Sequence, residues 1–236
     1  MKKIVIALTV LAFSVACQPP ANNEAVSKLE KRIADLEKTV TELKKRPAGK
    51  PQRPQPKPQT AAYKLPTGES AAYGKGTVDI TLWSDFQCPF CARVDPMLKK
   101  AVNDPELKGK VKLVFKHFPL SFHKDAKPAS KAAMAAGEQG PEKFWEMADK
   151  LLANQRDLKP DNFKKWAKEI GLNVGKFEKD LKANDAKYEA QIKGDMEMGS
   201  KTAKVRGTPS IYVGGWQLQQ RSVDGIKALL KDKKLL

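Results

Sequence analysis

VDITLWSDFQCPFC, residues 78–91, decides the fold of this chain, because a run rich in β-forming residues leads into two cysteines three positions apart. The segment after Cys91 can form a helix, so the cysteine pair lies at a predicted strand-to-helix junction. Two cysteines at this spacing can close a small disulfide. The sulfur of Cys88 would face the positive end of the helix, where its thiolate is favoured. This layout indicates a redox dithiol that exchanges disulfides with other proteins.

The composition is that of an ordinary folded protein. The 236 residues, 41% of them hydrophobic, allow one substantial domain or two small ones. Aromatic and aliphatic residues gather after residue 77, which places the predicted core there. Three cysteines are too few for a disulfide-stapled scaffold, so the closely spaced pair is predicted to serve chemistry and not structure.

The net charge of +17 comes from 44 basic against 27 acidic residues. Much of the excess is lysine scattered along predicted helical faces, which indicates a solvated surface. A nucleic-acid partner would need clustered basic residues with interleaved aromatics or a known motif, and the sequence has neither. Attraction to an anionic membrane or to acidic clients stays open.

Residues 1–17 resemble a targeting segment. Two lysines form a positive start, and the mostly apolar stretch 4–16 is too short to span a bilayer with ease. Small residues precede Cys17, as in a bacterial lipoprotein signal whose cysteine is lipidated, although Ser14 stands where such signals usually carry Leu. Simple secretion, with Cys17 as an ordinary residue, is the alternative. Both interpretations predict the periplasmic side of the bacterial cell envelope, and lipidation adds an anchor.

A helix with a coiled-coil pattern is predicted over residues 24–46. Its apolar residues recur at spacings of three and four, and they are Val26, Leu29, Ile33, Leu36, Val40 and Leu43. These are a and d positions over nearly three heptads. An isolated helix of this length is marginal in water, so the pattern predicts a homo-oligomer formed through residues 26–43. Val and Ile at a with Leu at d favour a parallel dimer, while a trimer, a lone stalk or packing on the chain's own domain stay open.

Residues 47–67 form a predicted proline-rich linker. Five prolines fall between residues 47 and 58, with almost nothing apolar among them. Such a segment cannot bury a core and favours extended polyproline II. The linker would therefore be a semi-rigid spacer between the coiled coil and a domain predicted over residues 68–236.

The domain's predicted elements run strand, helix, strand, several helices, hairpin and helix. Strands are expected at 77–83, 111–115 and 209–213, and two glycines should turn the last one into a hairpin. Between the second and third strands, apolar residues recur at helical spacing, which predicts a helical insertion over about 124–204. The fold class is therefore α/β.

Three motifs together resemble a known family, and they are Asp85-Phe86-Gln87-Cys88-Pro89-Phe90-Cys91, His117-Phe118-Pro119-Leu120 and Gly207-Thr208-Pro209-Ser210. Over roughly residues 75–233 the chain resembles the thioredoxin-like disulfide oxidoreductases of DsbA type. The resemblance implies a thioredoxin-like fold with an inserted helical subdomain. It also implies an enzyme, a protein thiol:disulfide oxidoreductase.

By this resemblance Cys88 is the nucleophile, and Cys91, deeper in the helix, resolves the mixed disulfide formed with a client. Pro89 occupies the first turn, where a helix tolerates proline best. Phe90 brings no charge, so the pKa of Cys88 is expected at about 4 to 6, held down mostly by the helix terminus. A structural disulfide or a chance pair is the alternative.

Thr208 and Pro209 are implied to form the family's cis-proline loop, which lies beside the attacking sulfur and pairs with the client's backbone. An ordinary trans turn is the alternative. One residue departs from the family's pattern, because Leu82 stands six residues before Cys88, where many thioredoxin-like enzymes bury an acid. Proton handling by a buried acid is therefore in doubt, although Asp85 lies nearer in sequence.

The two histidines do not indicate a metal site. His117 and His123 could imitate a Cys2His2 set together with the cysteine pair, but the strand-to-helix placement points to redox use. His117 is expected to close the second strand and His123 to lie at the surface or at a cap. No metal and no organic cofactor is implied, because the Cys88–Cys91 disulfide carries the electrons.

Three redox roles compete, namely oxidase, isomerase and reductase. The coiled coil favours isomerase-like or multi-client behaviour, since an oligomer can hold several redox sites around one client. The implied partners are proteins with thiols or disulfides and a redox-regenerating partner, either in the membrane or soluble. The alternative function is an envelope-anchored oligomeric scaffold or binding protein that uses a thioredoxin-like domain only for docking.

Overall fold

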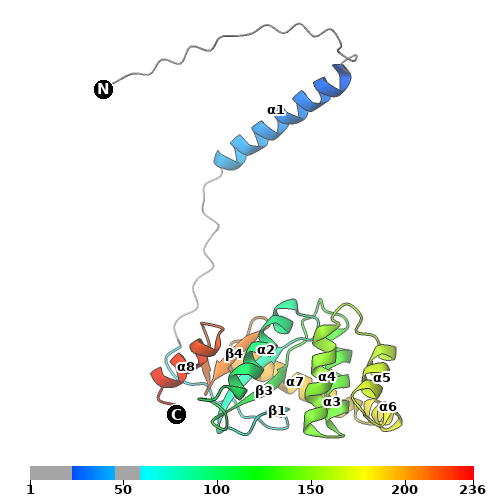
Figure 1. The fold of residues 1–236 in the computed structure, drawn as a ribbon, viewed down its shortest axis with the longest axis vertical. Helices are drawn as coiled ribbons and strands as arrows, with labels where there is room; N and C mark the ends of the chain where they lie inside the picture. Colours follow the sequence, from blue (N-terminus) through cyan, green and yellow to red (C-terminus); the bar gives the residue numbers. More distant parts are fainter. Residues whose placement is uncertain (1–22, 46–58) are drawn as a thin grey trace. The chain divides into compact units, whose positions relative to one another are not determined.

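The computed structural model describes residues 23–45 and 59–236. They form two units, which are helix α1 (Asn23–Lys45) and a domain over residues 59–236 (Figure 1). The predicted signal segment with Cys17, and most of the predicted linker, lie outside the described residues. Among those described, no helix is both long and apolar enough to cross a membrane.

Helix α1 carries the predicted coiled-coil pattern as one uninterrupted helix. The side chains of its apolar stripe are exposed to solvent, and the exposed fractions are 49% for Val26, 57% for Leu29, 54% for Ile33, 63% for Leu36 and 47% for Val40. The side chain of Leu43 lies outside the described residues. The helix prediction is confirmed, and oligomerisation stays a prediction.

The domain is built on a five-stranded sheet with the order β1-β3-β2-β4-β5. The central strands β2 and β3 run parallel, with Ile80 opposite Leu113, and the outer strands are antiparallel to their neighbours. Residues of both alternating faces are buried along β2 and β3, so both faces of the sheet are covered. The strands are β1 (Ala72–Tyr73), β2 (Val78–Ser84), β3 (Val111–His117), β4 (Ser210–Val213) and β5 (Trp216–Gln217).

Eight helical elements surround this sheet. They are α2 (Pro89–Asn103), α3 (Ala126–Gly137), α4 (Pro141–Ala153), α5 (Pro160–Glu169), α6 (Val174–Ala183), α7 (Asp185–Glu197), the π-helix η1 (Met198–Thr202) and α8 (Val223–Asp232). Three of them begin with proline, whose missing N–H is not needed at a first turn. Figure 1 shows α3–α6 grouped at one end of the domain and α8 at the other, next to β4.

The helices α3–α7 and η1 all lie between β3 and β4 in the chain, which confirms the predicted helical insertion. They bury aromatic residues against the sheet, and the ring of Phe115 on β3 lies 5.3 Å from that of Phe144 on α4. The segment η1 packs under β2, where a Cβ added to Gly199 would lie 2.6 Å from the indole nitrogen of Trp83. This close approach sets the path of the chain from η1 towards residues 207–210.

Two details differ from the sequence-based expectation. The short edge strand β1 was not foreseen, because two residues carry no periodicity. Residues 59–67, assigned to the linker by their composition, lie on the domain instead. There the N–H of Tyr63 donates to the Gly215 carbonyl at 2.9 Å, a contact that composition alone does not reveal.

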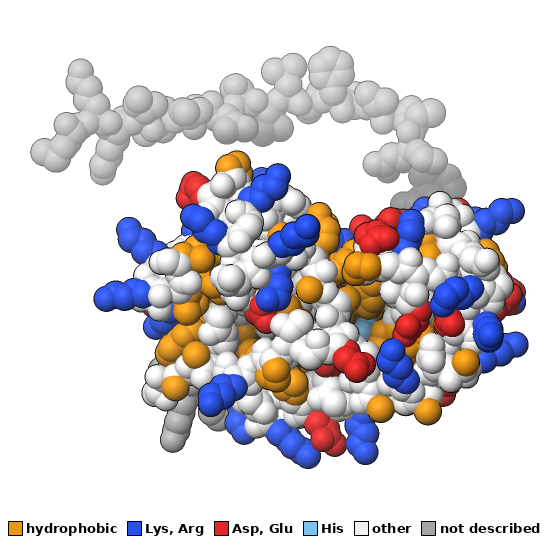
Figure 2. Space-filling view, turned by 90° about the horizontal axis from the view of Figure 1, so that it is seen from below, with side chains coloured by type: hydrophobic (Ala, Val, Ile, Leu, Met, Phe, Trp, Pro, Cys, Tyr) orange, Lys and Arg blue, Asp and Glu red, His pale blue; other side chains and the backbone are white. Residues whose placement is uncertain are grey.

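The basic excess is distributed over the surface. Figure 2 shows lysine and arginine side chains spread across the visible face and mixed with acidic ones, with apolar patches between them. Within the described domain many lysines pair with acids on neighbouring helices, such as Lys164 with Glu178 at 2.6 Å. This arrangement agrees with the expected solvated surface.

Candidate redox site

The cysteine pair lies at the predicted strand-to-helix junction. Cys88 is the residue that precedes α2, and Cys91 lies in its first turn. The Cys88 carbonyl accepts the N–H groups of Cys91 at 3.0 Å and Ala92 at 3.3 Å, so the first turn of the helix is built on it. Both cysteines are free thiols in this structure, and both are buried.

The Thr208–Pro209 loop lies against the first cysteine. The Thr208–Pro209 peptide bond is cis, as expected, and Cys88 Sγ lies 3.5 Å from the Thr208 carbonyl oxygen, to which it donates when it is protonated. The Thr208 hydroxyl is buried beside it. Arg221 Nη2 donates to the Pro209 carbonyl at 3.1 Å and supports the loop from the other side. The fold thus brings together two motifs that lie 120 positions apart.

The pKa values of the two cysteines are shifted in opposite directions. The pKa of Cys88 is lowered to about 5, mainly by the hydrogen bond from the Cys91 thiol, against the opposing effect of burial. Hydrogen bonds from Thr208 and from the backbone N–H groups of Cys91 and Phe90 lower it further. The pKa of Cys91 is raised, first because its proton is held by Cys88 and then because it is buried. At neutral pH the pair is therefore a Cys88 thiolate and a Cys91 thiol.

This acidity agrees with the expected range, but its main cause differs from the expected one. The helix terminus was predicted to provide most of the shift in the pKa of Cys88, whereas the neighbouring Cys91 thiol provides the largest contribution. The physical reason is distance, because a thiol three residues away in the first turn reaches the sulfur directly. The exposed Phe90 contributes only its backbone N–H.

Asp85, whose orientation the sequence left open, is fully buried and binds the loop after β3. Its carboxylate accepts the N–H of Gln87 at 2.7 Å and that of Leu120 at 2.8 Å. The same carboxylate lies 2.7 Å from Nδ1 of His123, so this histidine is a partner of Asp85 and only partly a surface residue. Asp85 therefore joins the cysteine segment to residues 118–125.

Two further residues of the site were missed by sequence reasoning. The Ser84 hydroxyl lies beside Cys91 and partly offsets the rise in its pKa. Gln155, in the loop after α4, donates to the carbonyls of Phe86 at 2.7 Å and Cys88 at 2.9 Å. Strand periodicity could have found Ser84, because it lies on the same face of β2 as Leu82. No sequence signal marks Gln155, since only the fold brings its loop to the cysteines.

The departure at position 82 persists in the structure, where Leu82 is a fully buried apolar residue. A buried carboxylate lies elsewhere, on α2. Asp95 follows Cys91 by four residues, so both lie on one face of the helix. Asp95 pairs with Lys99 at 3.0 Å, and burial raises the pKa of its carboxyl group.

The two histidines are placed in different surroundings. His117 closes β3 as expected, and its ring is buried among Phe86, Phe115 and Phe144. Burial lowers the pKa of His117 to about 3, so the ring is neutral. Within residues 23–45 and 59–236, no three His, Cys, Asp or Glu side chains come together as a metal site.

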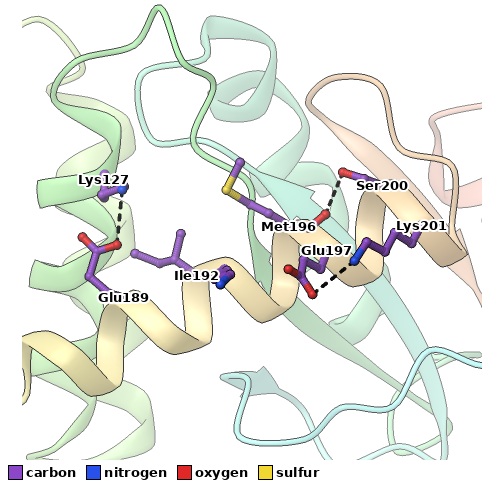
Figure 3. Close-up of a pocket in the computed structure, with 8 residues that line it drawn as sticks. Lys127, Glu189, Ile192, Met196, Glu197, Ser200 and Lys201 are labelled. Atoms are coloured by element: carbon purple, nitrogen blue, oxygen red, sulfur yellow. Dashed lines mark hydrogen bonds and ion pairs between the residues drawn. The ribbon is translucent and has the colours of Figure 1, made fainter.

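A hollow of about 460 Å³ lies along α7 and η1, away from the residues just described (Figure 3). Ile192 and Met196 give it an apolar floor, and Lys127 and Glu189 form an ion pair at its edge. None of its lining residues belongs to the cysteine pair or to the Thr208–Pro209 loop. The cysteine pair and the Thr208–Pro209 loop therefore lie outside this hollow.

Comparison with known proteins agrees with this geometry. The sequence model of the family described as "Thioredoxin" matches residues 66–232. The fold is similar to that of BdbD from Bacillus subtilis in its oxidised form, with a TM-score of 0.63, 23% identity, and coverage of 74% of this chain and 97% of that one. It is also similar to α-DsbA2 from Wolbachia pipientis, with a TM-score of 0.61, 20% identity, and coverage of 70% and 87%.

This chain belongs to the thioredoxin family. Its inserted helices give it the fold of the DsbA-type thiol:disulfide oxidoreductases.

Curated relatives fall into two kinds. The Na(+)/H(+) antiporter NhaA 1 of Salinispora arenicola is 34% identical over 139 residues, which cover 58% of this chain and 20% of that protein. The chain thus spans only about a fifth of that relative's length. Disulfide bond formation protein D of Bacillus subtilis is 27% identical over 155 residues, which cover 59% of this chain and 65% of that protein.

Proposed function

We propose that this chain is an extracytoplasmic thiol:disulfide oxidoreductase that exchanges disulfides with protein clients through Cys88 and Cys91. The observation that carries the proposal is the split acidity of the pair beside the Thr208–Pro209 loop. A thiolate attacks and leaves in disulfide exchange, and the pKa of Cys88, about 5, keeps it ionised at neutral pH. The disulfide formation named for the Bacillus relative supports the same chemistry here.

The exchange runs through a mixed disulfide. In the reduced protein, the Cys88 thiolate attacks a client disulfide, forms a bond to one client sulfur and releases the other as a thiolate. Cys91 then loses its proton and attacks Cys88, which closes the Cys88–Cys91 disulfide and frees the client dithiol. In the oxidised protein the same steps run backwards, so that the client is oxidised and the pair is reduced. When a client thiolate attacks the mixed disulfide in place of Cys91, the client is isomerised without net electron transfer.

The Thr208–Pro209 loop is proposed to hold the client during this exchange. The Thr208 carbonyl lies 3.5 Å from the reacting sulfur, and the Thr208 side chain lowers the pKa of that sulfur. A client segment laid against this loop would pair with its backbone while it presents its own sulfur to Cys88. The electrons stay on sulfur throughout, so no metal or organic cofactor is needed.

The decisive test is to trap clients. Cys91→Ala removes the resolving thiol, so mixed disulfides should accumulate on Cys88 and appear as adducts on non-reducing gels that vanish with dithiothreitol. Cys88→Ala is the matched control and should trap nothing. If Cys91→Ala gives no adducts, or Cys88→Ala gives as many, the proposed exchange is wrong. A scaffold that uses the domain only for docking would keep its function in Cys88→Ala.

We also propose that α1 joins copies of the chain in parallel. With Ile33 at a and Leu36 at d, Arg32 occupies a g position and Glu37 an e position of the heptad. In a parallel coiled coil Arg32 faces Glu37 of the partner subunit, so opposite charges pair. In an antiparallel coiled coil the e positions, which include two glutamates, would face each other and repel. Several redox sites would then share one client, which favours isomerisation. The test is refolding of a scrambled multi-disulfide protein by the wild type and by Leu29→Asp/Leu36→Asp. Equal refolding rates with the wild type and the double variant would show that the oligomer plays no part in isomerisation.

The envelope location is proposed from residues 1–17, and a structurally similar protein from Salmonella enterica that is described as periplasmic supports it. The lipid anchor is proposed from Cys17 and the residues before it alone. With lipidation at Cys17, fatty-acid label should be incorporated into the wild type and lost in Cys17→Ala. A labelled Cys17→Ala protein, or an unlabelled wild type, would reject the anchor and leave simple secretion.

A further inference from the structure

Two of the most exposed apolar side chains of the domain belong to segments at its redox site. Within the described part of the domain, three large apolar residues are exposed, namely Phe90 at 57%, Phe122 at 72% and Leu236 at 58%. Phe90 lies between the two cysteines. Phe122 lies in the loop that Asp85 and Gln87 bind. Because such side chains stay in water only at a cost, two exposed phenyl rings on segments joined to the cysteine pair indicate a surface that is covered in use.

The ring of Phe122 is held in position by the cysteine segment. It lies edge-on to the ring of His123, with 4.5 Å between the ring centres, and Nδ1 of His123 lies 2.7 Å from the Asp85 carboxylate. Two hydrogen bonds between Gln87 and Asp125 fasten the other end of the loop, one from the Asp125 N–H at 2.6 Å and one from the Gln87 amide at 3.2 Å. The exposed ring is therefore presented by a loop that is bonded to Asp85 and Gln87, just before Cys88.

Positive charges accompany these rings. The Arg93 guanidinium lies 5.3 Å from the centre of the Phe90 ring. Lys124 follows the anchored His123, and Arg206 precedes Thr208 by two residues. All three side chains belong to exposed residues, and none forms an ion pair within the part of the chain that the structure describes. The nearby acids are engaged already, because Asp85 and Asp125 bind the loop.

We propose that Phe90 and Phe122, with the cations Arg93, Lys124 and Arg206, form a docking surface for client segments whose cysteine is flanked by apolar and acidic side chains. The proposal rests on the proposed function and adds the chemical class of client. An apolar client residue would pack on the phenyl rings, while carboxylates beside it pair with the cations.

The test uses the oxidised full-length protein and three reduced peptides of equal length. Each contains one cysteine, flanked by leucine and glutamate, by leucine and lysine, or by glycine and serine. The rate of each exchange is divided by the rate of the same peptide with 2-hydroxyethyl disulfide, which corrects for its own thiol acidity. At low salt the glutamate peptide should react about tenfold faster than the lysine peptide, and this ratio should approach one at high salt. Equal corrected rates for the three peptides would overturn the proposal.

Variants assign the effect to the proposed residues. Lys124→Glu and Arg206→Glu should together reverse the preference between the charged peptides, and Phe122→Ser should slow both leucine peptides relative to the glycine–serine peptide. Lys179→Glu/Lys182→Glu is the matched control, because it makes the same total charge change on two exposed residues of α6, and it should leave the preference unchanged. If Lys179→Glu/Lys182→Glu has the same effect, net charge alone acts and the surface is rejected. A protein that fails to exchange even with dithiothreitol would instead refute the proposed function.

Discussion

Helix α1 and helix α2 place their apolar side chains in opposite surroundings. On α1 the coiled-coil stripe is 47% to 63% exposed, whereas Leu98 and Ala101 of α2 are fully buried in the domain. An amphipathic helix gains its stability from what covers its apolar face. The apolar face of α2 is buried within the domain. The apolar face of α1 has no other element of its own unit to pack against. Chemistry and assembly are therefore expected to be separable.

The largest effect should come from the reacting sulfur. Cys88→Ala should lower the rate of disulfide exchange by at least about a thousandfold, because Cys91 is buried with a raised pKa and cannot replace it. The measurement is insulin reduction or refolding of a scrambled protein. The oligomeric mass by light scattering should stay the same. A change in mass would show that the two regions are not separable.

A buried ion pair tests the stability of the domain. The Lys116 amine lies 3.2 Å from the Asp195 carboxylate, with both side chains almost completely buried, and the same carboxylate accepts the His117 N–H at 2.9 Å. Asp195→Ala leaves the lysine charge unpaired and should lower the free energy of unfolding by about 3–5 kcal/mol in urea titrations.

The control for this change is Glu197→Ala, two residues further along the chain, which removes the exposed pair of Glu197 with Lys201. The free energy of unfolding should then change by about 0.5 kcal/mol or less. Equal decreases in the free energy of unfolding for Asp195→Ala and Glu197→Ala would show that the buried pair stabilises the domain no more than the exposed pair does.

The oligomer should depend on α1 alone. Leu29→Asp/Leu36→Asp places charges on the exposed stripe and should reduce the mass to that of one chain, with loss of the concentration-dependent part of the helical circular dichroism signal. Ser27→Asp/Lys31→Asp, on the polar side of the same helix, is the control and should keep the oligomer. A monomeric wild type would reject the coiled coil.

The smallest expected effect is a change in the pKa of Cys88, the residue that precedes α2. Thiolate absorbance of the reduced protein should titrate with a midpoint at about pH 5. Cys91→Ala removes the largest cause and should raise this pKa by about one unit or more, equivalent to about 1.4 kcal/mol. Substitutions on α1 should leave it unchanged.

The sign of the pH dependence follows from this lowered pKa. A thiol whose folded pKa is lowered stabilises the folded reduced protein above its unfolded pKa, about 8.5, and this contribution is lost as the pH falls towards 5. Urea midpoints of the reduced protein, compared with those of the oxidised protein, should show this loss. The opposite trend would contradict the assigned acidity.

Much of the domain was predictable because its signals are local. A β-rich run, two cysteines in a first turn and repeated helical spacing identify β2, α2 and the inserted helices. The path of residues 59–67 was not predictable, since a proline-rich composition does not show that Tyr63 pairs with Gly215 on the hairpin. The strand β1 was missed for the same reason, because tertiary pairing with β3 alone defines it.

The sequence by itself determined the cysteine pair, the helix terminus behind it, the Thr208–Pro209 motif and the apolar stripe of α1, since each is a pattern of neighbouring residues. Only the tertiary structure decided that Asp85 fastens the loop carrying Phe122 and that Gln155 binds the cysteine segment. These contacts join parts of the chain that lie 35 and 67 positions apart. Burial and hydrogen bonding across such separations depend on how the layers pack, which no local pattern encodes.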